Sequence, residues 1–221
     1  MKNYFKNRKI LEDGNVYSKS MEHDACGVGL IASTEGKKSR KVVEYGISAL
    51  KAVFHRGAVD ADGKTGDGAG IHLEIPSDFF AEKIEITGHQ HDSSDICVGM
   101  IFLPRNNYEA QENARTLVES ELTKSNFNIY GWRQVPVNTK VLGEKANFTR
   151  PEITQVLFKN NDKSLKGKDL ERKLYESRRK IEKEAIKNAI DGFYICSLSS
   201  KSIIYKGMFL AESIAEFYTD L

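Results

Sequence analysis

The sequence predicts a layered domain that mixes strands and helices, of class α/β or α+β. Strand-sized apolar runs alternate along the chain with segments whose apolar residues recur every three or four positions, as on one face of a helix. The 221 residues are 40% hydrophobic and 29% charged, which is the usage of an ordinary globular protein. No internal repeat or low-complexity tract interrupts them. Fibrous and disordered classes are therefore excluded.

The first half of the chain is expected to alternate strands and helices. Continuous apolar runs are typical of buried strands, alternation with polar residues is typical of half-buried ones, and spacings of three and four indicate helices. Glycine clusters mark loops, and Ser77 is suited to cap a helix. In order, we expect a strand at 26–33, a helix from Val43 to near His55, a loop at 57–70, a strand at 71–75, a short helix from Ser77, a strand at 95–103 and a helix at 110–122.

The second half continues the same alternation. Strands are expected at 130–137 and 153–158, followed by the longest helix at 168–190 and a short final helix at 211–218. A hairpin is expected between them, with strands at 193–198 and 203–205 and its turn across residues 199–202. The stripe predicted to bury the longest helix consists of Leu170, Leu174, Ile181, Ala185, Ile186 and Ala189.

Charge and cysteine usage limit the classes of partner. Lys and Arg number 33 against 31 Asp and Glu, which is too balanced for sequence-independent nucleic-acid binding. Residues 162–190 carry a local basic excess, interpreted as a solvated face, with docking of nucleic acid or of an acidic partner as the alternative. Three widely spaced cysteines without a C-x-x-C motif favour a reducing, cytoplasmic setting. No apolar run reaches the roughly 20 residues of a membrane helix, and residues 1–25 do not form a secretory signal.

Several motifs nearly match known ligand sites. The stretch GAVDADGKT at 57–65 misses the spacing of a phosphate-binding loop by one residue, and a helix precedes it where a strand should. The acidic residues of the same stretch do not place glycine and glutamate where a calcium loop requires them. His89 and His91 are interpreted as exposed loop residues. No metal site is therefore predicted.

Cys26 has two interpretations. As a small apolar residue at the head of a strand it needs no further role, and Cys97 and Cys196 fit that structural interpretation well. Cys26, however, precedes Gly-Val-Gly and follows 25 largely polar residues. A thiol of pKa near 8.5 needs a base to act as a nucleophile at pH 7, and any contact from His55 or His72 depends on the fold. An α-amine of pKa about 7.7 to 8.0 would serve if Cys26 became the first residue.

Six motifs together carry a resemblance that spans nearly the whole chain. They are HDACGVGLIA at 23–32, FHRGA at 54–58, TGDGAG at 65–70, PSDFF at 76–80, YKGM at 205–208 and LAE at 210–212. In combination they resemble the glutaminase domain of glutamate synthase large subunits, a class II glutamine amidotransferase.

The resemblance implies a four-layered αββα fold of the N-terminal nucleophile hydrolases, within class α+β. It implies that residues 1–25 are a propeptide, that residues 26–221 are the N-terminal part of the domain, and that Cys26 is the catalytic nucleophile. Arg56 is then expected to order the site, Gly57 to permit the turn beside it, and Asp67 to order its loop. The implied substrate is glutamine, which the cysteine would cleave to release ammonia.

The resemblance stops before the family's domain is complete. An arginine segment that holds the glutamine carboxylate and an Asn-Gly pair that stabilises the oxyanion are both absent from the 221 residues. We therefore expect a truncated chain, incomplete at the C-terminus and nearly inactive alone, because losing one oxyanion donor costs about 100- to 1,000-fold in rate. No cofactor is expected here, whereas FMN and an iron-sulfur cluster are implied in a full-length parent.

The implied partners are downstream synthase domains and a small electron-donating subunit, with no nucleic acid and no membrane. Two alternatives stay open. One is a degenerate regulatory or assembly module in which Cys26 is never unmasked, and the other is an amidotransferase that serves a different ammonia acceptor.

Overall fold

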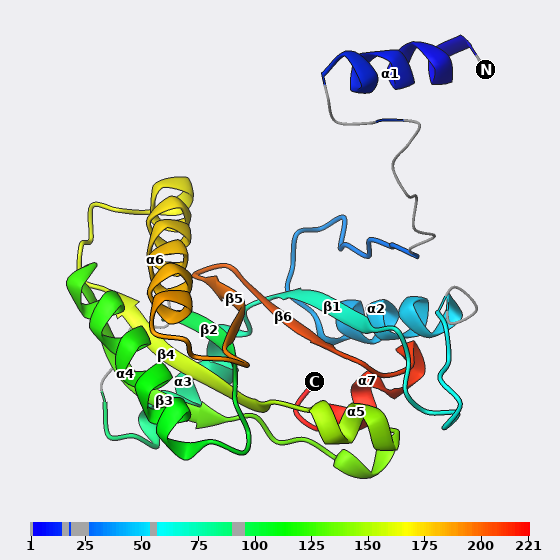
Figure 1. Cartoon of the computed structure of the whole chain (residues 1–221). Helices are drawn as coiled ribbons and strands as arrows, with labels where there is room; N and C mark the ends of the chain where they lie inside the picture. The colour runs from blue at the N-terminus through cyan, green and yellow to red at the C-terminus, as the bar shows by residue number, and fades with distance from the viewer. Residues whose placement is uncertain (1, 15–17, 19–26, 54–56, 90–95) are drawn as a thin grey trace.

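The computed structural model describes residues 2–14, 18, 27–53, 57–89 and 96–221 (Figure 1). Cys26 and Arg56, two of the four expected site residues, lie outside the described residues. Gly57 and Asp67 lie within them.

A four-stranded antiparallel sheet forms the centre of the molecule, in the order β3-β4-β2-β5. Its middle pair runs in register with Gly99 opposite Val156. The added Cβ of any other residue at 99 would meet Val156 and Leu198 at 2.7 and 2.8 Å, so the sheet requires glycine there. The strands are β2 (Ile96–Leu103), β3 (Phe127–Gln134), β4 (Glu152–Asn160) and β5 (Tyr194–Ser199).

Two helices cover the outer face of this sheet, α4 (Tyr108–Lys124) and α6 (Gly167–Lys187). Their buried side chains form one apolar cluster with alternate residues of the sheet, such as Cys97 and Ile101. The stripe predicted for α6 is confirmed at Leu174, Ile181 and Ala185, which are buried. It is wrong for Ile186 and Ala189, which are exposed. Ile186 lies about 100° around the helix from the buried Ala185, and Ala189 lies beyond the helix end at Lys187, with a positive φ of 51°.

A second sheet pairs β1 (Ala69–Glu74) with β6 (Ser202–Gly207), antiparallel and with Ala69 opposite Gly207. The predicted hairpin between residues 193 and 205 is therefore wrong. Its two strands exist, but β5 pairs with β2 whereas β6 pairs with β1. Ser199 and Ser200 at the crossing donate hydrogen bonds to Glu171, so α6 fixes the chain where it leaves one sheet for the other.

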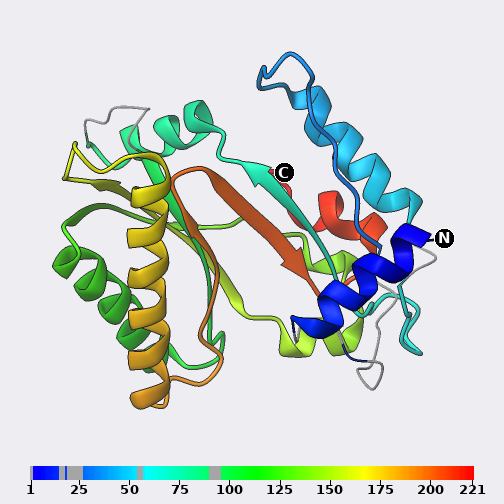
Figure 2. The same cartoon turned by 90° about the horizontal axis from the view of Figure 1, so that it is seen from above.

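The second apolar cluster lies between the two sheets and reaches the helices beyond them. It joins the other face of β2, including Val98 and Met100, to Ile203 and Tyr205 of β6. The layers thus follow as helices, sheet, sheet, helix (Figures 1 and 2), which confirms the α+β class. Three further helices contribute side chains to this cluster: α2 (Arg40–Ala52), which packs on β1, α3 (Ser77–Glu85), which contacts β2 and β3, and α7 (Ile214–Phe217).

The strand predicted at residues 26–33 is wrong over the part that the structure describes. Residues 27–33 are irregular, and the side chains of Val28 and Leu30 are 91% and 89% exposed. An apolar run becomes a strand only where a neighbour completes its ladder of hydrogen bonds, and none of the described strands pairs with this segment. The apolar run alone was therefore not enough to predict a strand here.

The remaining elements are short or lie at the ends of the chain. A helix that the sequence did not predict, α1 (Lys2–Asp13), stands clear of the layered body in Figure 1. Residues 139–149 form a 3₁₀ turn (Thr139–Val141) and α5 (Glu144–Thr149), and a second 3₁₀ turn (Ala211–Ser213) precedes α7. Among the described helices none is both long and apolar enough to cross a membrane.

Candidate active site

A cavity of about 1330 Å³ opens beside the second sheet. Its walls come from segments far apart in sequence: the glycine-rich loop at 57–70, β1, β6 and the residues that follow them, and α5 with the start of β4. Gly27 lines the same cavity. It is large enough for a small-molecule ligand, since ligand pockets span roughly 300 to 1,000 Å³.

The described site residues converge on this cavity. Gly57 and Asp67 both line it, and so does Gly27, which follows Cys26 directly in the sequence. His72, whose position the sequence left to the fold, lines it from β1. The structure therefore gathers Gly27, Gly57 and Asp67, one position from each of three motifs, around one space.

The glycine-rich loop is held as a narrow turn. Val59 pairs with Gly66 in an isolated antiparallel bridge, and the Asp60 amide donates to the Thr65 carbonyl at 2.8 Å. The amide of Asp67 donates to the Ala58 carbonyl at 3.3 Å, which ties Asp67 to the start of the loop. An added Cβ at Gly66 would meet the Phe209 backbone at 2.8 Å, so this loop approaches the strand end as only glycine permits.

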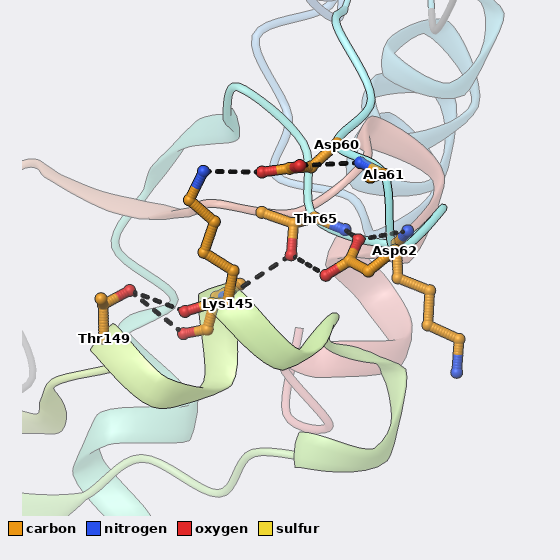
Figure 3. A network of polar contacts seen from close by, with 8 residues as sticks. Asp60, Ala61, Asp62, Thr65, Lys145 and Thr149 are labelled. Carbon is orange, nitrogen blue, oxygen red and sulfur yellow. Dashed lines mark hydrogen bonds and ion pairs between the residues drawn. The ribbon is translucent and has the colours of Figure 1, made fainter.

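Asp62 organises the tip of the loop (Figure 3). One carboxylate oxygen accepts the backbone amides of Lys64 and Thr65 at 2.9 and 2.7 Å, and the other accepts the Thr65 hydroxyl at 2.6 Å. These hydrogen bonds, led by that from the Thr65 hydroxyl, hold the pKa of Asp62 far below its ordinary value of 3.8. The aspartate is thus a structural acceptor of this turn in its ionised form.

The loop contacts α5, a helix that the sequence did not predict (Figure 3). Lys145 donates to Asp60 at 2.7 Å, and the Ala146 amide approaches the Thr65 hydroxyl oxygen at 3.4 Å. The hydrogen bond from Lys145 is the largest cause of the lowered pKa of Asp60. Six residues of mixed polarity carry no periodic signal, so no pattern in the sequence could have marked α5 as a wall of the site.

Arg150 places a cation at the end of α5, where it lines the cavity. Its Nε is buried and has no hydrogen-bond partner in the structure. Burial lowers the pKa of the guanidinium, and the nearby charge of Arg105 lowers it further. Lys206 of β6 also lines the cavity, and its ammonium donates to the Tyr194 hydroxyl at 2.7 Å.

The other two cysteines lie in the core, as the sequence indicated. Cys97 belongs to the cluster under α4 and α6, and Cys196 belongs to the cluster between the sheets. Burial raises the pKa of the Cys196 thiol to about 11, which suppresses its thiolate at neutral pH. In the part of the chain that the structure describes, no three His, Cys, Asp or Glu side chains gather as metal ligands would.

Comparison with known proteins identifies relatives for nearly all of the sequence. A family model described as "Glutamine amidotransferases class-II" matches residues 26–221. The matched region begins at Cys26 and includes every wall of the cavity.

Curated relatives are much longer than this chain. The glutamate synthase [NADPH] large chain of Azospirillum brasilense is 54% identical over 215 residues, which cover 97% of this chain and 14% of that protein. A ferredoxin-dependent glutamate synthase of Pyropia yezoensis is 38% identical over 218 residues, covering 96% of this chain and 14% of the relative. Ferredoxin-dependent glutamate synthase 2 of a Synechocystis strain is 39% identical over 201 residues, covering 90% and 12%. The chain therefore spans about one seventh of these relatives.

Proposed function

Because this chain belongs to the class II glutamine amidotransferases, we propose that it is the glutamine-hydrolysing part of a glutamate synthase large subunit. The observation that carries the proposal is the convergence of Gly27, Gly57 and Asp67 on one cavity, within a region that aligns with glutamate synthases over 97% of the chain. The proposed substrate is glutamine, and the ammonia released would serve glutamate synthesis from 2-oxoglutarate elsewhere in a longer parent.

Cys26 is the proposed nucleophile, exposed as the first residue when residues 1–25 are removed as a propeptide. Its thiolate would add to the side-chain amide carbon of glutamine. The carbon–nitrogen bond then breaks as the α-amine passes a proton to the leaving nitrogen, which releases ammonia and leaves a glutamyl thioester. Water adds to the thioester carbon and the carbon–sulfur bond breaks, which releases glutamate and regenerates the thiol.

The neighbouring motifs are proposed to order this centre. Arg56 would hold groups beside the nucleophile, and Gly57, which lines the cavity, would let the backbone approach it closely. Asp67 would act through its loop, because its amide closes the turn at Ala58. All three are then positioning residues, and Cys26 alone forms a bond to the substrate.

The cofactors of glutamate synthesis are proposed to lie outside this chain. An iron-sulfur cluster needs several cysteine thiolates, whereas the two described cysteines lie in different core clusters. The described residues therefore do not fit such a cluster. FMN, the cluster, the synthase domains that follow and a small electron-donating subunit are assigned to the parent assembly, in the cytoplasm.

The mature N-terminus and a covalent label test this function together. We expect the complete polypeptide that the gene encodes, expressed from Met1, to lose residues 1–25, as read by intact mass, and to be modified once by a glutamine-analogue diazoketone. Peptide mapping should place the label on Cys26, glutamine should protect it, and Cys26→Ala should abolish labelling and lower ammonia release by at least about 1,000-fold.

Three results would contradict the proposal. Retention of residues 1–25 in the cellular protein would favour a regulatory or assembly module. A label on Cys97 or Cys196 in the native protein would exclude Cys26 as the selective nucleophile. Downstream sequence unlike that of a glutamate synthase would instead favour an amidotransferase with another ammonia acceptor.

A further inference from the structure

The N-terminus of α5 is capped from a distant part of the chain. Gly143 occupies the N-cap position and makes no side-chain cap hydrogen bond, since it has no side chain. The amide of Ala146, which a capping side chain would normally satisfy, instead approaches the hydroxyl oxygen of Thr65 at 3.4 Å. Thr65 precedes Ala146 by 81 residues, so the glycine-rich loop supplies the cap that the local sequence omits.

The capping hydroxyl is held in place by Asp62. Its proton is donated to Asp62 at 2.6 Å, which leaves its lone pairs to face the Ala146 amide. Thr65 is only 2% exposed, so water does not readily replace either contact. Figure 3 shows this chain of contacts, from the Asp62 carboxylate through the Thr65 hydroxyl to the first turn of α5.

Gly143 is the counterpart that makes the contact possible. A Cβ at position 143 would lie 2.2 Å from both the Thr65 hydroxyl oxygen and an Asp62 carboxylate oxygen. The contact therefore depends on all three residue types together, aspartate at 62, threonine at 65 and glycine at 143, which we call one set. The second link between the loop and the helix, from Lys145 to Asp60, has a lysine that is 67% exposed and leaves room for water.

The two elements joined by this set are adjoining walls of the cavity. Gly57, Gly63 and Asp67 line it from the loop. Ala146 and Arg150 line it from α5. Because α5 has only six residues and a helix this short is marginal by itself, its position depends on its cap and its tertiary contacts.

We propose that Asp62 and Thr65 are positioning residues of the glutamine site, which clamp α5 to the glycine-rich loop and thereby fix the position of α5 as a wall of the cavity. This inference rests on the proposed function. It assigns the two residues to substrate binding, since neither lies on the route of the proton or of the bond that breaks. Loss of either residue should weaken the binding of glutamine and its analogues. The rate at which Cys26 reacts with an analogue once it is bound should be retained.

The test compares three variants in the complete polypeptide that the gene encodes, expressed from Met1. Thr65→Val removes the hydroxyl at nearly constant shape, Thr65→Ser restores it, and Thr154→Val is the matched control. Thr154 is also 2% exposed and donates its hydroxyl to the Ile101 carbonyl, but it does not line the cavity. Inactivation by a glutamine-analogue diazoketone yields KI for binding and kinact for the chemical step.

Thr65→Val should raise KI about 5- to 30-fold, the range that loss of a helix cap produces, with kinact within about twofold of wild type. Thr65→Ser should bring KI back near the wild-type value, and Thr154→Val should leave it unchanged. Iodoacetamide, which needs no glutamine site, should modify Cys26 at similar rates in all four proteins. If Thr65→Val does not fold, Asp62→Asn replaces it and should raise KI less but in the same direction.

The outcomes separate the two proposals. An unchanged KI in Thr65→Val, or an equal increase in Thr154→Val, overturns the clamp. A fall in kinact at constant KI overturns it as well, because the residue would then act on the chemistry. If Cys26 of the wild type reacts with neither reagent, the proposed nucleophile is wrong and the clamp, as a feature of a glutamine site, falls with it.

Discussion

At the residue scale, the two cysteines that the structure describes, Cys97 and Cys196, are both buried. Cys97 and Cys196 are packed into two apolar clusters, and burial has raised the pKa of Cys196 to about 11. A buried thiol of this pKa reacts slowly with electrophiles at neutral pH. Selective chemistry at Cys26 is thus favoured by the inertness of the other two.

This contrast predicts the pattern of alkylation. At pH 8 iodoacetamide should leave Cys97 and Cys196 unmodified in the native chain and should modify both in about 6 M guanidinium chloride. Peptide mass mapping after each treatment measures the difference. Rapid modification of Cys196 without denaturant would show that the cluster between the sheets opens far more often than its packing indicates.

Asp62 makes the stability of the folded chain depend on pH. Its pKa in the folded chain lies below the ordinary value of 3.8, so the folded state binds its proton more weakly than the unfolded state does. The resulting stabilisation is fully present when the pH is above the pKa of Asp62 in the unfolded chain. It is lost as the pH falls through the lower pKa that Asp62 has in the folded chain. Unfolding by urea, followed from pH 7 to pH 2, should show stability falling below about pH 4.

Asp62→Asn is the variant that isolates this contribution. It keeps the shape of the side chain but cannot titrate, so the acid limb of the stability profile should become shallower. Asp67→Asn in the same loop is the comparison. An acid limb that is identical in Asp62→Asn and wild type would contradict the assigned role of the carboxylate.

At the scale of elements, the fit between α5 and the glycine-rich loop predicts the cost of a single methyl group. Gly143→Ala places a Cβ 2.2 Å from two oxygens, and such overpacking typically costs about 1 to 3 kcal/mol. Gly29→Ala is the control, since nothing lies within 4 Å of its added Cβ. Urea denaturation should show the loss only in Gly143→Ala, and equal stability of the two variants would exclude the close contact.

A buried ion pair fixes the end of the chain to the central sheet. Arg133 of β3 donates to Asp220 at 2.6 Å and to Gln155 at 2.7 Å, and the two charged side chains are only 16% and 8% exposed. Removing one partner leaves a buried charge uncompensated.

Arg133→Met should therefore destabilise the chain by about 3 to 5 kcal/mol, measured by urea denaturation. Lys37→Met breaks the pair of Lys37 and Glu35, which is largely exposed, and should change stability little. If Arg133→Met proves as stable as Lys37→Met, the ion pair of Arg133 and Asp220 does not stabilise the folded chain and the prediction is wrong.

The elements that the sequence predicted well are those whose partners are local. The helices α4 and α6 were recognised because a 3.6-residue period records which face is buried. The strands β5 and β6 were located but wrongly paired, because adjacency in sequence favours a hairpin and cannot show that β1 offers the better edge. The helix α5 was missed because its cap is Thr65, far away in the chain.

At the scale of the whole molecule, the motifs predicted which residues matter and the fold showed what they surround. Gly57 and Asp67 were expected from resemblance, and both line the cavity. The contribution of α5 and Arg150 could not be foreseen, since 81 residues separate Thr65 of the loop from Ala146 of α5 in the chain. The roles of Cys26, Arg56, Gly57 and Asp67 stay predictions.

The absence of an Asn-Gly dipeptide predicts how active these 221 residues are by themselves. The resemblance implies that such a pair stabilises the oxyanion. Ammonia release from glutamine should therefore be at least about 100- to 1,000-fold slower than in the complete polypeptide. A coupled ammonia assay on both proteins at equal concentration decides this, and comparable rates would refute it.

The pairing of β1 with β6 has a consequence for biosynthesis. Ala69 lies opposite Gly207, so the chain must leave the ribosome as far as residue 207, nearly all of the 221 residues, before the second sheet can close. Closing so long a loop is entropically costly and is repaid late, which slows folding. During that interval the apolar face of β1 has no partner strand, and a nascent chain paused before residue 202 would be a natural client for a chaperone.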